Sequence, residues 1–176
     1  MKLNEIVYRE EPLPSDLLRV GEIVASSDFF SKEELEIALE LVQERLQKGV
    51  SSGYHFLFAE RDGRVIGYAC FGPIPGTRES YDLYWIAVEN ELRGSGLGKA
   101  LLEKTEKKIG ELGGRRIYVE TSSREQYRPT QAFYSKCGYA QEALLKDFYS
   151  PGDDKSIYVK NSPPVQPHSR KCRHSG

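Results

Sequence analysis

The stretch LRGSGLGKALL, residues 92–102, places three glycines directly before an apolar, helix-forming run. Gly94, Gly96 and Gly98 leave the backbone bare, so its N–H groups can approach a bound anion closely. The positive end of the following helix dipole would point to the same place, and basic residues beside the glycines can add charge-assisted contacts. The pattern therefore predicts a site for a diphosphate, although a plain left-handed turn between a strand and a helix would use glycines in the same way.

Two common nucleotide-binding loops have a different spacing. A Walker A loop ends in Gly-Lys-Ser or Gly-Lys-Thr, whereas Lys99 is followed by Ala100. A dinucleotide fingerprint reads Gly-x-Gly-x-x-Gly, whereas this loop reads Gly-x-Gly-x-Gly. The spacing therefore argues against both nucleotide-binding folds.

The elements that must position this loop follow from the periodicity of the chain. Residues 1–160 predict one domain with the order β-α-α-β-β-β-α-β-α-β-β. Ser31 and Glu34 form a capping box before the second helix, and the dipeptide Asp62-Gly63 predicts a tight hairpin. The run 81–88 is apolar throughout, which predicts a central strand covered on both faces just before the glycine loop.

The end of the chain has a different composition. Residues 161–176 are rich in proline, serine and charge, and we expect them to form a disordered tail because they can bury little apolar surface. His168, Cys172 and His174 of this tail would make a poor metal site, so no metal is predicted.

Composition and charge limit the class of partner. The chain has 176 residues, a formal net charge of −1 and three cysteines without a Cys-x-x-Cys pair. The net charge argues against a nucleic-acid-binding face built on bulk charge. No apolar run reaches the about 20 residues of a membrane helix, and residues 1–12, MKLNEIVYREEP, contain no apolar stretch of the kind that a signal sequence carries. We therefore expect a cytoplasmic protein with neither a nucleic-acid nor a membrane partner.

Two blocks of the sequence carry a resemblance to a known family. Residues 88–102 resemble the acetyl-CoA loop of the GNAT superfamily of N-acetyltransferases, in which Arg or Gln is followed after two residues by Gly-x-Gly or Gly-x-Ala. Arg93, Gly96 and Gly98 fill that pattern, while Asn90 stands where the family usually has proline. The run TQAFYSKCGY, residues 130–139, is similar to a second family block, and the chain resembles the ribosomal-protein alanine N-acetyltransferases among the members.

The resemblance implies the fold and the general reaction. The fold would be α/β of the α+β type, a mixed and mostly antiparallel sheet of six or seven strands, splayed where two central strands run parallel and flanked by four helices. The reaction would move an acetyl group from the co-substrate acetyl-CoA to a primary amine of a small molecule or a protein, in a monomer or a homodimer. An acyl-CoA-binding regulatory or interaction module without turnover is the alternative. The implied acetyl-CoA contacts are Ile86, Ala87, Val88, Arg93, Gly94, Ser95, Gly96, Leu97, Gly98 and Lys99.

Acetyl transfer to an amine also needs a base and an acid. An ammonium with a pKa of about 10 must lose a proton, and the departing thiolate must gain one. Tyr134 matches the tyrosine that many family members hold near the sulfur, and Glu120 resembles the catalytic glutamate of the alanine N-acetyltransferases, with Asp82 as the rival base. Neither Cys70 nor Cys137 has an adjacent histidine to activate it, which favours direct attack in a ternary complex over a ping-pong route. Residues predicted to line the acceptor site are Phe29, Phe30, Tyr84, Trp85 and Phe148.

Overall fold

The computed structural model describes residues 5–27 and 30–162. One seven-stranded sheet crosses the molecule in the order β1-β2-β3-β4-β5-β7-β6. Neighbouring strands are antiparallel except for β4 and β5, which are parallel. The strands are β1 (Val7–Arg9), β2 (His55–Arg61), β3 (Arg64–Pro73), β4 (Ser80–Val88), β5 (Arg116–Ser122), β6 (Ala140–Ser150) and β7 (Asp153–Asn161).

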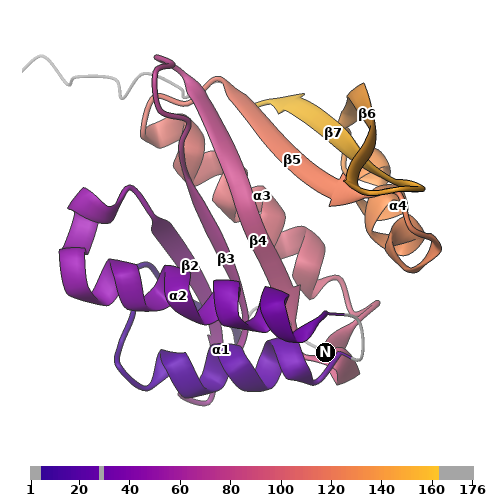
Figure 1. The fold of residues 1–176 in the computed structure, drawn as a ribbon. Helices are drawn as coiled ribbons and strands as arrows, with labels where there is room; N and C mark the ends of the chain where they lie inside the picture. Colours follow the sequence, from indigo (N-terminus) through magenta and orange to yellow (C-terminus); the bar gives the residue numbers. More distant parts are fainter. Residues whose placement is uncertain (1–4, 28–29, 163–176) are drawn as a thin grey trace, which may run out of the picture.

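Four α-helices cover the two faces of the sheet. Figure 1 shows α1 and α2 in front of β2, β3 and β4, with α3 behind them. Two separate hydrophobic clusters follow this division, one under α1 and α2 and the other between the sheet, α3 and α4. The helices are α1 (Asp16–Ala25), α2 (Lys32–Lys48), α3 (Leu97–Glu111) and α4 (Arg128–Lys136), with short 3-10 turns η2 (Gly49–Ser52), η3 (Asn90–Leu92) and η4 (Glu125–Tyr127). The predicted fold class and order of elements are confirmed.

Local sequence signals set several of these boundaries. Ser31 begins α2 through a capping box, because its side chain accepts from the backbone N–H of Glu34 and its own N–H donates to the Glu34 carboxylate. Asp62 and Gly63 both have positive φ angles, 53° and 74°, as a two-residue hairpin turn requires. Both predictions from the sequence are confirmed.

The sheet divides between β4 and β5. The two strands pair only where Ser80–Asp82 lies beside Arg116–Tyr118, and Figure 1 shows them diverging beyond that point. β5 instead pairs with β7 along its whole length. The expectation that β4 is covered on both faces is therefore wrong for its second half, which is only partly buried, with Tyr84 37% exposed. The apolar residues there border the opening left by β5.

A β-bulge changes the direction of the β4 side chains. Trp85 lies opposite Cys70 while Leu83 lies opposite Phe71, so Tyr84 is the extra residue. As a result Leu83 and Ile86 both pack in the cluster beside α3, and Trp85 packs in the cluster beneath α1 and α2. The bulge thus shifts the alternation of the β4 side chains after Tyr84, so that odd-numbered residues face the α3 side before it and the α1–α2 side after it.

The last described residues continue the sheet slightly beyond the predicted domain boundary. β7 runs to Asn161, and the N–H of Ser162 donates to the carbonyl of Arg115. Residues 163–176 of the predicted tail 161–176, with His168, Cys172 and His174, lie outside the described residues. Within the described residues there is no cluster of three His, Cys, Asp or Glu side chains that could hold a metal ion. No helix in this part of the chain is both long and apolar enough to cross a membrane.

Candidate active site

The glycine loop joins the open end of β4 to α3. Gly94 and Gly96 have left-handed φ angles of 75° and 88°, and Gly96 is the N-cap of α3 without any side-chain cap. A Cβ on Gly94 would meet nothing within 4 Å, and a Cβ on Gly98 would only touch the Phe133 ring at an ordinary 3.9 Å. The packing of the chain therefore does not require glycine at position 98. The Leu97 N–H donates to the Ser95 hydroxyl oxygen at 3.4 Å. The N–H groups of Gly96 and Gly98 have no such partner among the described residues, so they fit an anion such as the pyrophosphate of acetyl-CoA.

The side chains of this loop differ in burial and in their polar contacts. Ser95 donates its hydroxyl to the carbonyl of Leu92, and the Leu97 side chain is fully buried in the core. Leu97 can therefore offer a ligand only its backbone. Lys99 is exposed, and its ammonium lies 3.8 Å from the carboxylate of Glu103.

The edge of β4 beyond Asp82 is open toward β5. Ile86, Ala87 and Val88 pair with β3 on one side. On the other side, no strand among the described residues pairs with them. An extended chain with amide groups, such as the pantetheine arm of acetyl-CoA, can pair with such an edge as an added strand would.

Tyr134 lies on α4, in the buried cluster against which Ile86 and Val88 of the open edge also pack. Its side chain is buried, with the ring of Tyr139 at 5.5 Å and that of Tyr158 at 6.4 Å. Burial raises the pKa of the Tyr134 hydroxyl well above its usual value, so the group stays protonated at neutral pH. Within the described part of the chain the hydroxyl has no hydrogen-bond partner, which leaves its proton for a ligand.

Asp82 and Glu120 come together where β4 and β5 begin to diverge. Asp82 lies opposite Tyr118, and Glu120 follows two residues later on the same face of β5. Partial burial and the nearby charge of Glu120 raise the pKa of Asp82 to about 6, while Lys155 acts in the opposite direction. Glu120 itself is ion-paired with Lys155 from β7. The structure thus brings both candidate bases to one place.

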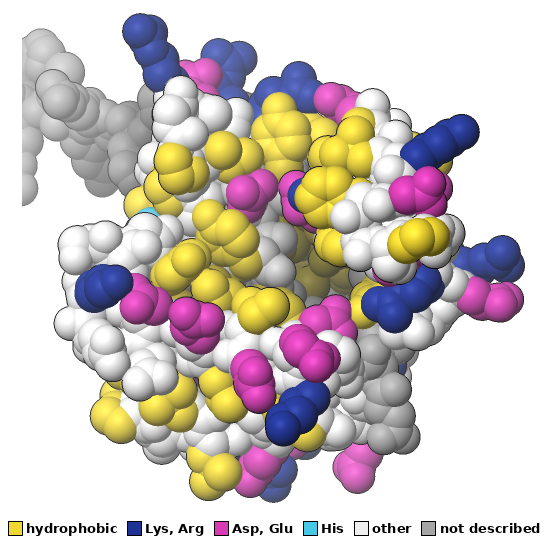
Figure 2. Space-filling model, viewed as in Figure 1, with side chains coloured by type: hydrophobic (Ala, Val, Ile, Leu, Met, Phe, Trp, Pro, Cys, Tyr) yellow, Lys and Arg dark blue, Asp and Glu magenta, His cyan; other side chains and the backbone are white. Residues whose placement is uncertain are grey.

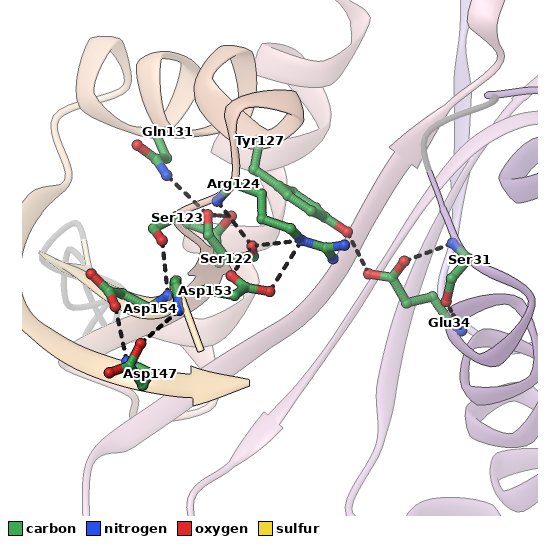
Figure 3. Close-up of polar contacts among 12 residues, drawn as sticks. Ser31, Glu34, Ser122, Ser123, Arg124, Tyr127, Gln131, Asp147, Asp153 and Asp154 are labelled. Atoms are coloured by element: carbon green, nitrogen blue, oxygen red, sulfur yellow. Dashed lines mark hydrogen bonds and ion pairs between the residues drawn. The ribbon is translucent and has the colours of Figure 1, made fainter. Parts of the chain in front are cut away.

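The β6–β7 hairpin is fixed to the end of β5 by a polar network (Figure 3). Asp153 is buried, accepts from the Ser122 hydroxyl and pairs with Arg124 at 3.0 Å. The Asp147 carboxylate accepts from the Gly152 N–H at 2.6 Å inside the hairpin turn. Further bonds join Ser123 to Asp154, Asp147 to Asp154 and Gln131 to Ser122. These bonds hold the part of the hairpin that carries Phe148 and Lys155.

One hydrogen bond crosses from this region to α2. The Tyr127 hydroxyl donates to the Glu34 carboxylate at 2.7 Å (Figure 3). The other oxygen of the same carboxylate caps α2 by accepting from Ser31. Burial and this bond raise the pKa of Tyr127 to about 12. Glu34 therefore links the start of α2 to the segment before α4.

Most residues predicted to line the acceptor site lie on the α1–α2 side of the sheet. The Phe30 ring packs on Trp85 at 4.9 Å, and Tyr84 meets the ring of Tyr54 edge-on at 5.5 Å. Phe148 is exposed on the hairpin, and the Lys155 ammonium lies 4.2 Å from its ring centre. Phe29 lies outside the described residues. Figure 2 shows this face hollowed near its centre, with hydrophobic and acidic side chains at the rim.

The sequence analysis missed three residues of this region, Tyr54, Tyr127 and Lys155. The position of Lys155 depends on the register that sets it opposite Ser122, and no local motif gives that register. The sequence does indicate one feature of Lys155. Successive side chains of a strand point to opposite faces, so Lys155 and Ile157 of β7 lie on the same face.

Comparisons with known proteins agree with this geometry. The model of the acetyltransferase (GNAT) family matches residues 21–139. An uncharacterised N-acetyltransferase of Methanocaldococcus jannaschii is 32% identical over 108 residues, which are 61% of this chain and 67% of that protein. A Bacillus subtilis protein provisionally named a ribosomal protein bS18 alanine N-acetyltransferase is 26% identical over 105 residues, which are 60% of this chain and 66% of that protein. The matches thus span about two thirds of the length of these curated relatives.

Solved structures show the same architecture. A provisionally assigned acetyltransferase of the GNAT family from Desulfovibrio desulfuricans is 46% identical, with a TM-score of 0.88 over 90% of this chain and 99% of that chain. The family match covers more than half of the chain and includes the glycine loop, both carboxylates and Tyr134. The chain therefore belongs to the acetyltransferase (GNAT) family and is an acetyl-CoA-dependent N-acetyltransferase, distantly related to the ribosomal bS18-alanine N-acetyltransferases.

Proposed function

We propose that this enzyme acetylates a primary amine by direct attack in a ternary complex with acetyl-CoA. The observation that carries the proposal is the opening between β4 and β5. An uncapped glycine loop lies at one end of this opening, and a buried tyrosine and two carboxylates lie beside it. This arrangement supplies an anion site, an acid and a base around one cleft.

Acetyl-CoA would be held mainly by backbone groups. The N–H groups of Gly94, Gly96, Gly98 and Lys99 would bind its pyrophosphate, because those of Arg93, Ser95 and Leu97 already donate within the loop. The open edge at residues 86–88 would bind its pantetheine arm. A backbone N–H of the same edge could also stabilise the thioester oxygen as negative charge develops on it. When bound, acetyl-CoA supplies the acetyl carbon that forms the C–N bond as its C–S bond breaks.

The side chains of the enzyme would manage the protons. The acceptor arrives as an ammonium, and one of the carboxylates, Asp82 or Glu120, would accept its proton. Tyr134, which burial keeps protonated, would donate to the departing sulfur. The acceptor nitrogen gives up two protons in total, one to the sulfur through Tyr134 and one to solvent through the carboxylate. No other acid or base is needed for this balance.

The cysteines support direct attack over a covalent acetyl-enzyme. Cys70 is fully buried and Cys137 is partly buried. Burial raises the pKa of both thiols, so neither is a thiolate at neutral pH. A ping-pong route would need such a thiolate as its nucleophile.

The acceptor side fits a cationic amine on a small molecule or on a protein. Two carboxylates attract an ammonium, and the nearby rings of Tyr84 and Phe148 can contact its alkyl part. The provisional name of the Bacillus subtilis relative points to a protein α-amine. Among the acceptors to be tested, an alanine-initiated peptide is therefore the first choice.

The test is an acceptor screen with acetyl-CoA. Release of free CoA thiol would be measured with amino-terminal peptides, lysine peptides, polyamines and small amines, and acetylated products would be identified by mass spectrometry. We expect tight acetyl-CoA binding and thiol release that depends on the acceptor. Binding of acetyl-CoA without turnover on any amine would instead favour the regulatory or interaction module.

A further inference from the structure

Lys155 occupies a distinctive position on the acceptor side. It lies on β7, its side chain is only 13% exposed, and its ammonium is ion-paired with the Glu120 carboxylate. The same ammonium lies 4.2 Å from the centre of the Phe148 ring, which supports a cation by its electron-rich face. Two partners on different strands therefore hold this lysine in place.

Asp82 has no comparable partner. Its carboxylate makes no ion pair or hydrogen bond with any side chain in the described part of the protein. The charged and titratable groups that act on it are Glu120 from β5, Lys155 from β7 and Tyr84 from its own strand. On β3, the residue opposite Asp82 is Gly72, which carries no charge. Of the two candidate bases, only Glu120 is ion-paired.

We propose that Lys155 is a positioning residue which holds Glu120 in an ion pair and so leaves Asp82 as the carboxylate that deprotonates the acceptor. This inference rests on the proposed function, since it assigns the base of that reaction. In the step itself, an N–H bond of the ammonium breaks and an O–H bond forms on Asp82. The proton then leaves Asp82 for solvent, and the Lys155–Glu120 pair keeps its charges throughout.

The electrostatics favour this division of roles. For Glu120 to accept the proton, its ion pair would have to be broken while Lys155 remained largely buried and charged, which is unfavourable. Asp82 has no pair to break, and its pKa of about 6 gives it a higher proton affinity than an ordinary aspartate.

The experiment compares pH profiles of kcat/KM for matched variants. In the wild-type enzyme, activity should fall as the pH drops through about 6, because Asp82 becomes protonated. Lys155→Met should move this acidic limb to higher pH by about one unit or more, whereas Lys155→Arg should keep it in place. Lys146→Met, at an exposed site on the same hairpin, is the control for loss of a nearby positive charge.

Neutralising each of the two carboxylates in turn should lower kcat to very different extents. Asp82→Asn should lower kcat by about 100-fold or more, as loss of a general base does. Glu120→Gln should lower kcat far less and should move the acidic limb to lower pH, because it removes the negative charge that raises the pKa of Asp82. A large loss with Glu120→Gln and a small loss with Asp82→Asn would overturn the proposal, as would an unshifted limb in Lys155→Met.

A second measurement works without turnover. In the free enzyme, the carboxyl ¹³C resonance of Asp82 should titrate near pH 6, and its midpoint should rise in Lys155→Met but not in Lys146→Met. If no amine is acetylated, the proposed function fails, yet this titration still tests the charge arrangement. Mass spectrometry of enzyme incubated with acetyl-CoA would overturn the inference if Lys155 itself became acetylated, since Lys155 would then be an acceptor.

Discussion

The two sides of the opening between β4 and β5 are built from different parts of the chain. The proposed cofactor side is one continuous segment, from the second half of β4 through the glycine loop into α3, and it presents mainly backbone. The acceptor side is assembled from side chains of α2, β4, β5, η4 and the β6–β7 hairpin. The first depends on backbone conformation and the second on strand register, so single substitutions should affect them separately.

The strands next to the two sides also differ in how deeply they are buried. β3, next to the cofactor strand, is buried at all but its two end residues, whereas nearly every residue of β6 is exposed. The hairpin that carries the acceptor side is therefore held mainly by pairing with β5 and by the polar network around Asp153. A shared core protects the cofactor side, and a few polar contacts position the acceptor side.

The largest effect should come from the loop backbone. Gly96→Val places a branched side chain at a φ of 88°, in the space that the pyrophosphate would occupy. We expect acetyl-CoA affinity to fall by more than about 100-fold, since good backbone anion contacts are lost, while far-UV circular dichroism stays unchanged. Isothermal titration calorimetry measures the affinity.

A matched control separates this effect from strain. Gly76 also has a left-handed φ, 79°, with open space at its Cβ, but it lies in the loop between β3 and β4. Gly76→Val should cost a similar amount of stability, about 1–2 kcal/mol, and leave acetyl-CoA affinity intact. Normal affinity in Gly96→Val would show that the ligand does not use this loop.

The second effect concerns Tyr134, the proposed proton donor. Tyr134→Phe removes only a hydroxyl, so we expect kcat to fall by about 10 to 1000-fold with little change in acetyl-CoA affinity. Tyr158→Phe makes the same change on a ring that packs 6.4 Å from that of Tyr134 and serves as the control. Equal rates for both variants and the wild type in steady-state kinetics would exclude Tyr134 as the acid.

The two sides also differ in what the sequence can predict. The capping box at Ser31, the hairpin at Asp62 and the glycine loop each depend on residues a few positions apart, and local conformational preferences suffice to predict them. The contact between Lys155 and Glu120 depends on the register of β5 with β7. The bond from Tyr127 to Glu34 joins residues far apart in the chain. Such contacts follow from tertiary packing, which no local pattern encodes.

The bulge at Tyr84 shows the same limit within a single strand. The apolar run 81–88 predicts a strand correctly, but an extra residue opposite β3 cannot be recognised from apolar character alone. The prediction that this run is buried on both faces was wrong for a related reason. β5 stops pairing with β4 after Asp82, and this divergence depends on the arrangement of the whole sheet.

The third effect should be confined to the acceptor side. Asp153→Ala removes the acceptor of the Ser122 hydroxyl and the ion-pair partner of Arg124, and it leaves a buried polar group unsatisfied. We expect a loss of about 1–3 kcal/mol in the free energy of unfolding and a several-fold higher KM for the acceptor. The acetyl-CoA dissociation constant should not change, and a parallel loss of acetyl-CoA binding would contradict the independence of the two sides.

The smallest effect is expected at the bond between η4 and α2. Tyr127→Phe removes the hydroxyl that donates to Glu34, but the ring and the capping bond from Ser31 to Glu34 remain. A single hydrogen bond of this kind contributes about 0.5–1.5 kcal/mol, or roughly 2- to 13-fold in an equilibrium constant. If the bond positions α2 beside the acceptor, the acceptor KM should change by a factor within that range while kcat stays constant. The same change in unfolding free energy with an unaltered KM would assign the bond to stability alone, and a fall in kcat would show that Tyr127 acts on the reacting groups.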